Sequence, residues 1–277
     1  MLDLLKAALL GVIEGITEWL PVSSTGHMIL VEQLLKLDQP EEFMAMFRVV
    51  IQLGAILAVV VVFWNKLWPL GRRRDGSTAL KMPTLRLWGK VIIATIPAMV
   101  LGLLLDDWLD AHFYNYVTVA AMLILYGVLF IMVENQRIQP QTTRLSQITP
   151  AQALVVGLWQ VLAMIPGTSR SGATIVGGLL LGLSRACVAE FTFYLAIPVM
   201  AGASFLKVVK YVAGGLSFTL LQVGVLAVGC AVAFVVSIVA IRFLMSYVQK
   251  HDFRFFGVYR IALGVVVLIV AVASAVA

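Results

Sequence analysis

The chain has 277 residues, of which 61% are apolar and only 12% are charged, and its formal net charge is +6. Soluble domains of this size carry about twice that share of charged residues, so the composition excludes a soluble globular protein and indicates a polytopic α-helical membrane protein. We expect no nucleic acid as a partner, because Lys and Arg gather in the loops on one side of the predicted membrane topology.

Eight apolar stretches follow one another along the chain, and six have the length and character of a membrane-spanning helix. They cover residues 5–34, 47–66, 88–105, 117–134, 151–183, 188–210, 219–245 and 257–276. The first and fifth stretches differ, because each has a proline followed by a Ser/Thr/Gly cluster near its middle. A helix broken there leaves main-chain groups unpaired, which membrane depth tolerates only inside protein or beside a wet cavity. We therefore expect two re-entrant helix–loop–helix segments.

These two broken stretches resemble each other at an offset of 146 residues. The offset pairs Gly11 with Gly157, Glu14 with Gln160, Ser23 with Ser169, Thr25 with Ser171 and Gly26 with Gly172. Each half of the chain, about 1–140 and 147–277, then holds one re-entrant segment and three spans. Because an odd number of spans inverts the second half, we expect a single all-α membrane domain of two inverted-topology repeats, with a site at the bilayer midplane.

Lys and Arg set the expected orientation of the chain in the membrane. If the 66–90 loop faces the cytoplasm, alternation also places residues 135–150, 184–187 and 242–260 there. These four segments carry 14 of the 20 basic residues, and only five lie on the other side. Both termini and the mouth of the site are therefore expected on the outer side.

Two carboxylates lie before the break in the first stretch. Glu14 and Glu18 are four residues apart, so they share one face of a helix, and Gly11 and Gly15 near that face would let another backbone approach. Two ionised carboxylates would repel each other unless a divalent cation, a shared proton or Arg170 intervened. The alternative is that both lie at an exposed outer mouth and merely meet solvent.

A hydroxyl cluster with a histidine follows the break. Ser23, Ser24 and Thr25 are followed by His27, so a Ser hydroxyl and the His ring could act as nucleophile and base. His27 could equally be the nucleophile itself or a general acid. The alternative is a helix cap, with Ser23 or Ser24 capping a helix that begins near Thr25. Both readings are compatible, because a helix N-terminus presents free N–H groups to an anion.

The fifth stretch contains an isolated arginine. Arg170 is the only charged residue between Arg144 and Arg185, and a guanidinium stays charged in proteins, at a cost of about 2.5 kcal/mol or more at membrane depth. Hydroxyls, glycine-flanked loop N–H groups and a forked guanidinium together suit a phosphate group. The alternative is that the arginine pairs with a carboxylate of the first stretch. A substrate phosphate could then displace that carboxylate from the arginine.

Both polar clusters resemble signature motifs of one known family, the bacterial undecaprenyl-pyrophosphate phosphatases of the bacitracin-resistance type. The first motif occupies residues 14–27 and reads EGITEWLPVSSTGH, and the second occupies residues 166–174 and reads PGTSRSGAT. Both occur uninterrupted, and the resemblance covers essentially the whole chain.

The resemblance implies an integral membrane hydrolase that cleaves the phosphoric anhydride of undecaprenyl pyrophosphate, giving undecaprenyl phosphate and inorganic phosphate. This reaction recycles the lipid carrier for peptidoglycan synthesis, cell-wall biogenesis and cell shape, and it lowers sensitivity to the antibiotic bacitracin. The family needs a divalent cation, Mg²⁺ or Ca²⁺. Its site is taken to face the outer, periplasmic side of the bacterial cytoplasmic (inner) membrane.

The resemblance and the residues together predict a pocket made of two loops. The expected catalytic residues are Glu14, Glu18, Ser24, His27 and Arg170, with Glu14 and Glu18 also as metal ligands. The expected phosphate-binding residues are Ser23, Thr25, Thr168, Ser169, Arg170, Ser171 and Thr174. The attacking group is Ser24, His27 or an activated water.

The expected partners are a polyprenyl pyrophosphate lipid and the membrane lipids, and a homodimer stays an open alternative. A second functional class is also compatible with this architecture: a secondary transporter or flippase for an anionic lipid or small anion would use the same midplane site without cleaving a bond.

Overall fold

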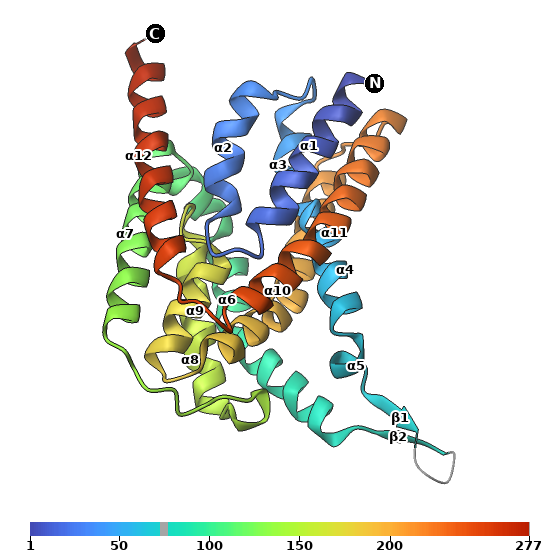
Figure 1. The fold of residues 1–277 in the computed structure, drawn as a ribbon. Coiled ribbons are helices and arrows are strands. Elements are labelled where there is room, and N and C mark those ends of the chain that lie inside the picture. The colour runs from blue at the N-terminus through green and yellow to red at the C-terminus, as the bar shows by residue number, and fades with distance from the viewer. Residues whose placement is uncertain (73–76, 277) are drawn as a thin grey trace.

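The computed structural model in Figure 1 describes residues 1–72 and 77–276 and consists almost entirely of helices. Its helices are α1 (Leu2–Thr17), α2 (Ser24–Leu34), α3 (Glu41–Val50), α4 (Gln52–Val62), α5 (Trp64–Leu67), α6 (Met82–Phe113), α7 (Tyr116–Asn135), α8 (Pro150–Val161), α9 (Arg170–Leu180), α10 (Arg185–Ala213), α11 (Leu220–Tyr247) and α12 (Arg254–Val276). Short 3-10 turns cover Leu145–Gln147 and Leu162–Met164. The strands β1 (Leu70–Arg72) and β2 (Thr78–Leu80) form one antiparallel hairpin, which the sequence analysis did not predict.

Within the described ranges, six helical segments are long and apolar enough to cross a membrane. They are Glu41–Val62, Met82–Leu105, Tyr116–Asn135, Arg185–Ala213, Leu220–Tyr247 and Arg254–Ser274. The prediction of an all-α protein with six spans is confirmed, and the chain is a multi-pass membrane protein. The first span begins at Glu41 rather than at residue 47, because the charged first turn of α3 continues into the apolar helix α4.

The two broken stretches form helix–loop–helix pairs. Helices α1 and α2 have 16 and 11 residues, and α8 and α9 have 12 and 11, whereas a membrane span needs about 20. In Figure 1 both chain termini lie at the same end of the bundle, and α1 runs inward from that end before α2 returns to it. The break between α1 and α2 therefore lies inside the bundle.

Glycines bring one helix of each pair close to a neighbouring helix. A Cβ atom at Gly11 of α1 would lie 2.7 Å from the carbonyl oxygen of Gly229 in α11, and one at Gly157 of α8 would lie 2.2 Å from that of Ala94 in α6. The expected close approach at Gly11 is confirmed, and Gly157 makes the equivalent contact at the predicted offset. Small residues permit such backbone contacts between membrane helices.

The basic segment 242–260 is mostly helical, because α11 continues to Tyr247 and α12 begins at Arg254. Arg260 therefore lies within α12, where it is fully buried. The terminal nitrogens of this guanidinium donate to main-chain oxygens inside the protein, whereas its Nε has no partner among the described residues.

We predict that Gly157→Ala destabilises the protein by about 1–3 kcal/mol, because the added methyl group overlaps the α6 backbone. The matched control is Gly102→Ala in α6, where an added Cβ meets nothing within 4 Å. Thermal unfolding of the two purified variants checks the prediction. Equal midpoints would contradict the close packing of α8 on α6.

Candidate active site

The two broken segments meet through an ion pair. Nη2 of Arg170, the first residue of α9, donates to Oε1 of Glu18 at 3.2 Å, and Glu18 immediately follows α1. Ser171 adds a second link, because its hydroxyl donates to the carbonyl oxygen of Glu18 at 3.3 Å. Both charged side chains are about nine-tenths buried. The structure thus shows the alternative in which Arg170 pairs with a carboxylate of the first stretch.

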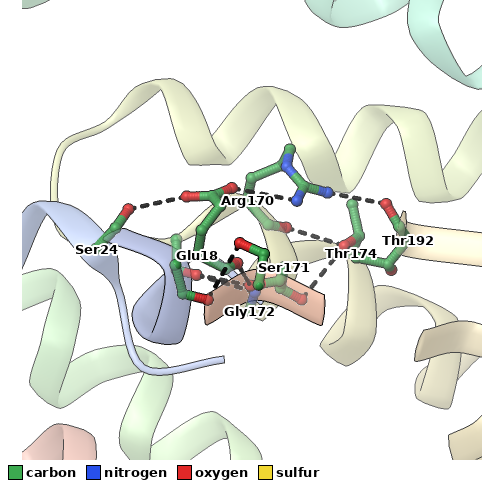
Figure 2. Close-up of polar contacts among 10 residues, drawn as sticks. Glu18, Ser24, Arg170, Ser171, Gly172, Thr174 and Thr192 are labelled. Carbon is green, nitrogen blue, oxygen red and sulfur yellow. Dashed lines mark hydrogen bonds and ion pairs between the residues drawn. The ribbon is translucent and has the colours of Figure 1, made fainter. Parts of the chain in front are cut away.

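Glu18 also binds the hydroxyl that follows the break. Ser24 Oγ donates to Glu18 Oε2 at 2.9 Å, so each carboxylate oxygen has a different partner. Figure 2 shows Glu18 between Ser24 on one side and Arg170 on the other. The carboxylate therefore stands where it could accept a proton from Ser24.

Arg170 is held in place from its other side. Its Nη1 donates to the carbonyl oxygen of Thr192 in α10 at 2.9 Å, and its guanidinium carbon lies 5.6 Å from the ring centre of Trp19. The hydroxyl of Thr174 donates to the carbonyl oxygen of Arg170 at 2.9 Å and accepts from Thr192 Oγ1 at the same distance. Thr174 thus lies behind Arg170, away from Ser24 and Glu18 (Figure 2).

Both loops end in the same strained serine cap. Ser23 and Ser169 have φ values of 74° and 68°, a region that non-glycine residues occupy only at an energetic cost. Each caps the helix that follows: Ser23 Oγ accepts from the N–H of Gly26 at 3.3 Å, and Ser169 Oγ accepts from that of Gly172 at 3.2 Å. The cap at Ser23 is confirmed, and the helix begins one residue earlier than expected. Two helix N-termini, with their partial positive charge, therefore adjoin Glu18.

Glu14 is a buried carboxylate beside Glu18. It is 1% exposed and interacts electrostatically with Glu18, which is 7% exposed. The alternative that both merely meet solvent at an exposed mouth is therefore wrong. Among the described residues, Glu14 Oε1 has no hydrogen-bond partner. The same holds for both amide atoms of the equivalent residue Gln160 and for the hydroxyl of Thr168. Unpartnered polar atoms at this depth are expected to bind water or a ligand.

A cavity of about 440 Å³ adjoins the first loop. Its lining includes Glu14, Ser24 and Thr25 of the predicted site, together with Arg48 and Lys207. The lining thus combines carboxylates with basic side chains, and Arg48 is itself paired with Glu32 and Glu41. A larger cavity of about 660 Å³ touches none of the predicted site residues, so its size does not make it the site.

His27 does not bind Ser24 in the structure. Its Nε2 lies 2.7 Å from the hydroxyl of Tyr259, and its Nδ1 lies 2.8 Å from the carbonyl oxygen of Ser23. The Ser24 hydroxyl is directed to Glu18 instead. The structure therefore brings serine and carboxylate together, whereas the sequence suggested a serine–histidine pair.

Sequence reasoning missed several neighbours of the loops, among them Thr192 in α10 and two residues in α12. Tyr259 contacts His27, and Arg260 donates to main-chain oxygens of both loops. The signal for Arg260 was present, since it lies in an apolar stretch as Arg170 does. Serine and threonine residues surround Arg170 in the sequence but not Arg260, so only Arg170 was singled out.

Comparison with known proteins gives consistent matches over almost the whole chain. The family model described as "Bacitracin resistance protein BacA" matches residues 7–266. A protein named "Undecaprenyl-diphosphatase" from Enterococcus faecalis is 53% identical over 271 residues, which is 97% of each chain. A protein of the same name from Desulfitobacterium hafniense is 56% identical over 272 residues, covering 97% of this chain and 96% of that one.

Proposed function

The chain belongs to the bacitracin resistance protein BacA family, and we propose that it is an undecaprenyl-diphosphatase. It hydrolyses undecaprenyl pyrophosphate to undecaprenyl phosphate and inorganic phosphate, which recycles the lipid carrier of cell-wall synthesis. The observation that carries this proposal is the buried pair of Glu18 and Arg170, where the two family motifs meet. A transport protein could use such an anion site, but a serine hydroxyl directed at a carboxylate is specifically suited to bond cleavage.

The terminal phosphate of the substrate takes the place of Glu18 on Arg170. Arg170 has a forked guanidinium whose Nε has no partner among the described residues, and the capped N-termini of α2 and α9 add N–H groups nearby. We assign the hydroxyls of Thr25, Thr168 and Ser171 to the same phosphate. Thr174 supports Arg170 instead, because its hydroxyl is bonded to the Arg170 carbonyl.

Glu18, once released from Arg170, serves as the base for Ser24. The Ser24 oxygen attacks the terminal phosphorus, Glu18 accepts its proton, and the bond from phosphorus to the bridging oxygen breaks. Undecaprenyl phosphate leaves, and water then hydrolyses the phosphoserine to regenerate Ser24. We assign to His27, in the first turn of α2, the donation of a proton to the leaving group. Phosphate-ester hydrolysis without a catalyst is extremely slow, so positioning and charge stabilisation must supply most of the acceleration.

The residues fit a divalent cation at Glu14 and Glu18. Glu14 offers a buried carboxylate oxygen without a partner in the described part of the chain. No group of three or more His, Cys, Asp or Glu side chains occurs among the described residues. Two carboxylates are nonetheless sufficient for Mg²⁺, which commonly completes its coordination with water and substrate phosphate oxygens. Such a cation would neutralise charge on the pyrophosphate.

The proposal includes a midplane site that opens to the outer side of the bacterial cytoplasmic membrane. Helices α1, α2, α8 and α9 are too short to span, which supports two re-entrant segments in one domain of two inverted repeats, about 1–140 and 147–277. The matching serine caps at positions 23 and 169 support the repeat. The cavity beside Ser24 is also lined by Glu41, the first residue of α3. Helix α2, which precedes α3, returns to the end of the bundle that carries both termini (Figure 1).

Release of inorganic phosphate from undecaprenyl pyrophosphate tests the proposed function directly. The purified protein in detergent, with Mg²⁺ or Ca²⁺ and without a membrane gradient, is expected to release phosphate catalytically. A transporter would bind the lipid and release none. Failure to release phosphate with either cation would therefore favour the transport class.

Arg170→Gln is predicted to lower kcat by about 10³-fold or more, because it removes the fixed positive charge that meets the transferring phosphoryl group. The control is Arg242→Gln, which makes the same chemical change at an exposed position of α11 and should leave kcat unchanged. Steady-state phosphate release measures both. A folded Arg170→Gln protein with normal turnover would exclude Arg170 from the site.

Glu14→Gln is predicted to raise the cation concentration needed for half-maximal activity, because one carboxylate ligand is lost. Glu18→Gln should in addition lower kcat by about 10²-fold or more, since the base is lost as well. Cation titrations of both variants are compared with Glu42→Gln, an exposed change in α3. Titration curves that superimpose on the wild-type curve would show that neither carboxylate holds the cation.

A further inference from the structure

A second buried arginine connects the two loops. Arg260 of α12 is 0% exposed, and its terminal nitrogens donate only to main-chain oxygens in the described contacts. Nη1 donates to the carbonyl oxygen of Pro21 at 3.3 Å. Nη2 donates to those of Gly167 and Thr168, at 2.9 and 2.8 Å. Pro21 precedes α2, and the other two residues precede α9, so one guanidinium holds both loops.

Arg260 donates hydrogen bonds to equivalent residues of the two proposed repeats. Pro21 and Gly167 differ by 146 positions, which is the offset that relates the two halves of the chain. The two residues occupy the same place before the strained serines Ser23 and Ser169. A side chain that binds both therefore lies between the repeats and fixes one loop relative to the other.

Burial of the Arg260 guanidinium is energetically unfavourable, which suggests that it has a role other than packing. A buried charge is unfavourable without a partner of opposite sign, and no carboxylate pairs with Arg260 in the described ion pairs. Its Nε also has no partner there, and the nearest compensation described is the ring of Tyr126, 5.6 Å from the guanidinium carbon. An apolar residue of similar volume would avoid this cost, so packing alone does not explain the arginine.

The contacts of Arg260 bear directly on loop geometry. A trans peptide directs its N–H opposite to its C=O, so binding the Thr168 carbonyl turns the N–H of Ser169 away from the guanidinium. Ser169 has the strained positive φ, which persists only where the surroundings enforce it. A Cβ atom added to Gly172, in the first turn of α9, would lie 3.0 Å from Nη1 of Arg260. The glycine thus leaves room for the guanidinium beneath the helix N-terminus.

We propose that Arg260 is a positioning residue that holds the two phosphate-binding loops in register across the repeat boundary, so that Ser24 and Arg170 face the same phosphate. The proposal rests on the function proposed above. The neighbouring residue Tyr259 extends the same support to His27, at the other side of the Ser23 cap.

Arg260→Lys and Arg260→Met test this role. Lysine keeps the charge but lacks the planar fork that reaches three carbonyls, and methionine removes both. Both variants are expected to lower kcat by about 10–100-fold, the range found for residues that orient a reacting group, with KM changed by less than about threefold. The control is Arg254→Lys at the start of the same helix, where the arginine pairs with Asp252 near the surface and activity should be unchanged.

Amide hydrogen exchange gives a readout that does not depend on activity. In Arg260→Lys, deuterium uptake is expected to rise together in residues 18–24 and 165–172 and to stay unchanged in α6. Gly172→Ala displaces the guanidinium without removing charge, and it should raise uptake in the same two segments even if Arg260→Met fails to fold.

Several outcomes would overturn the role of Arg260. Unchanged exchange in both loops, or increased exchange in only one, would show that it does not couple them. A lower unfolding midpoint with normal kcat in the Arg260 variants would show that Arg260 stabilises the fold without positioning the loops for catalysis. If the wild-type protein releases no phosphate, the proposed function fails, while the exchange measurement still decides whether Arg260 holds the loops.

Discussion

The site depends on one ion pair, between Glu18 and Arg170. Both side chains are about nine-tenths buried, so either charge without its partner would be energetically unfavourable. A guanidinium stays charged when buried, and removal of one partner from a buried pair leaves a costly unpaired charge. The pair requires α1 to end and α9 to begin at the same point inside the bundle, so both helix–loop–helix segments break there. Serine caps begin the helices that follow both breaks, and close glycine contacts hold α1 and α8 against neighbouring helices.

The internal repeat that we propose would explain why the two loops are alike and yet have different proposed roles. Ser24 and Arg170 are equivalent positions at the offset of 146, and each is the first residue of its helix. Both donate to the Glu18 carboxylate, one to each oxygen. One copy thus supplies the hydroxyl and the other the cation, while Met164 stands at the position equivalent to Glu18. In our account, duplication provided the two loops, and divergence at these positions gave them complementary roles.

Much of this arrangement was predictable from residue patterns, and the remainder depended on three-dimensional contacts. Long apolar stretches identify spans reliably, and a proline with hydroxyls and glycine inside such a stretch marked both breaks. Pattern alone could not show that Ser24 binds Glu18 rather than His27, because both candidates lie within a few residues of it. Arg260 is far from both motifs in sequence, and its partners are main-chain oxygens, which leave no trace in side-chain composition.

A structure of the protein with a bound phosphate analogue such as vanadate tests most directly the claim that both loops hold one phosphate. The account predicts the anion between the N-termini of α2 and α9, in contact with Arg170, with Glu18 displaced from the guanidinium and still close to Ser24. An anion bound elsewhere, with the pair of Glu18 and Arg170 intact, would contradict it.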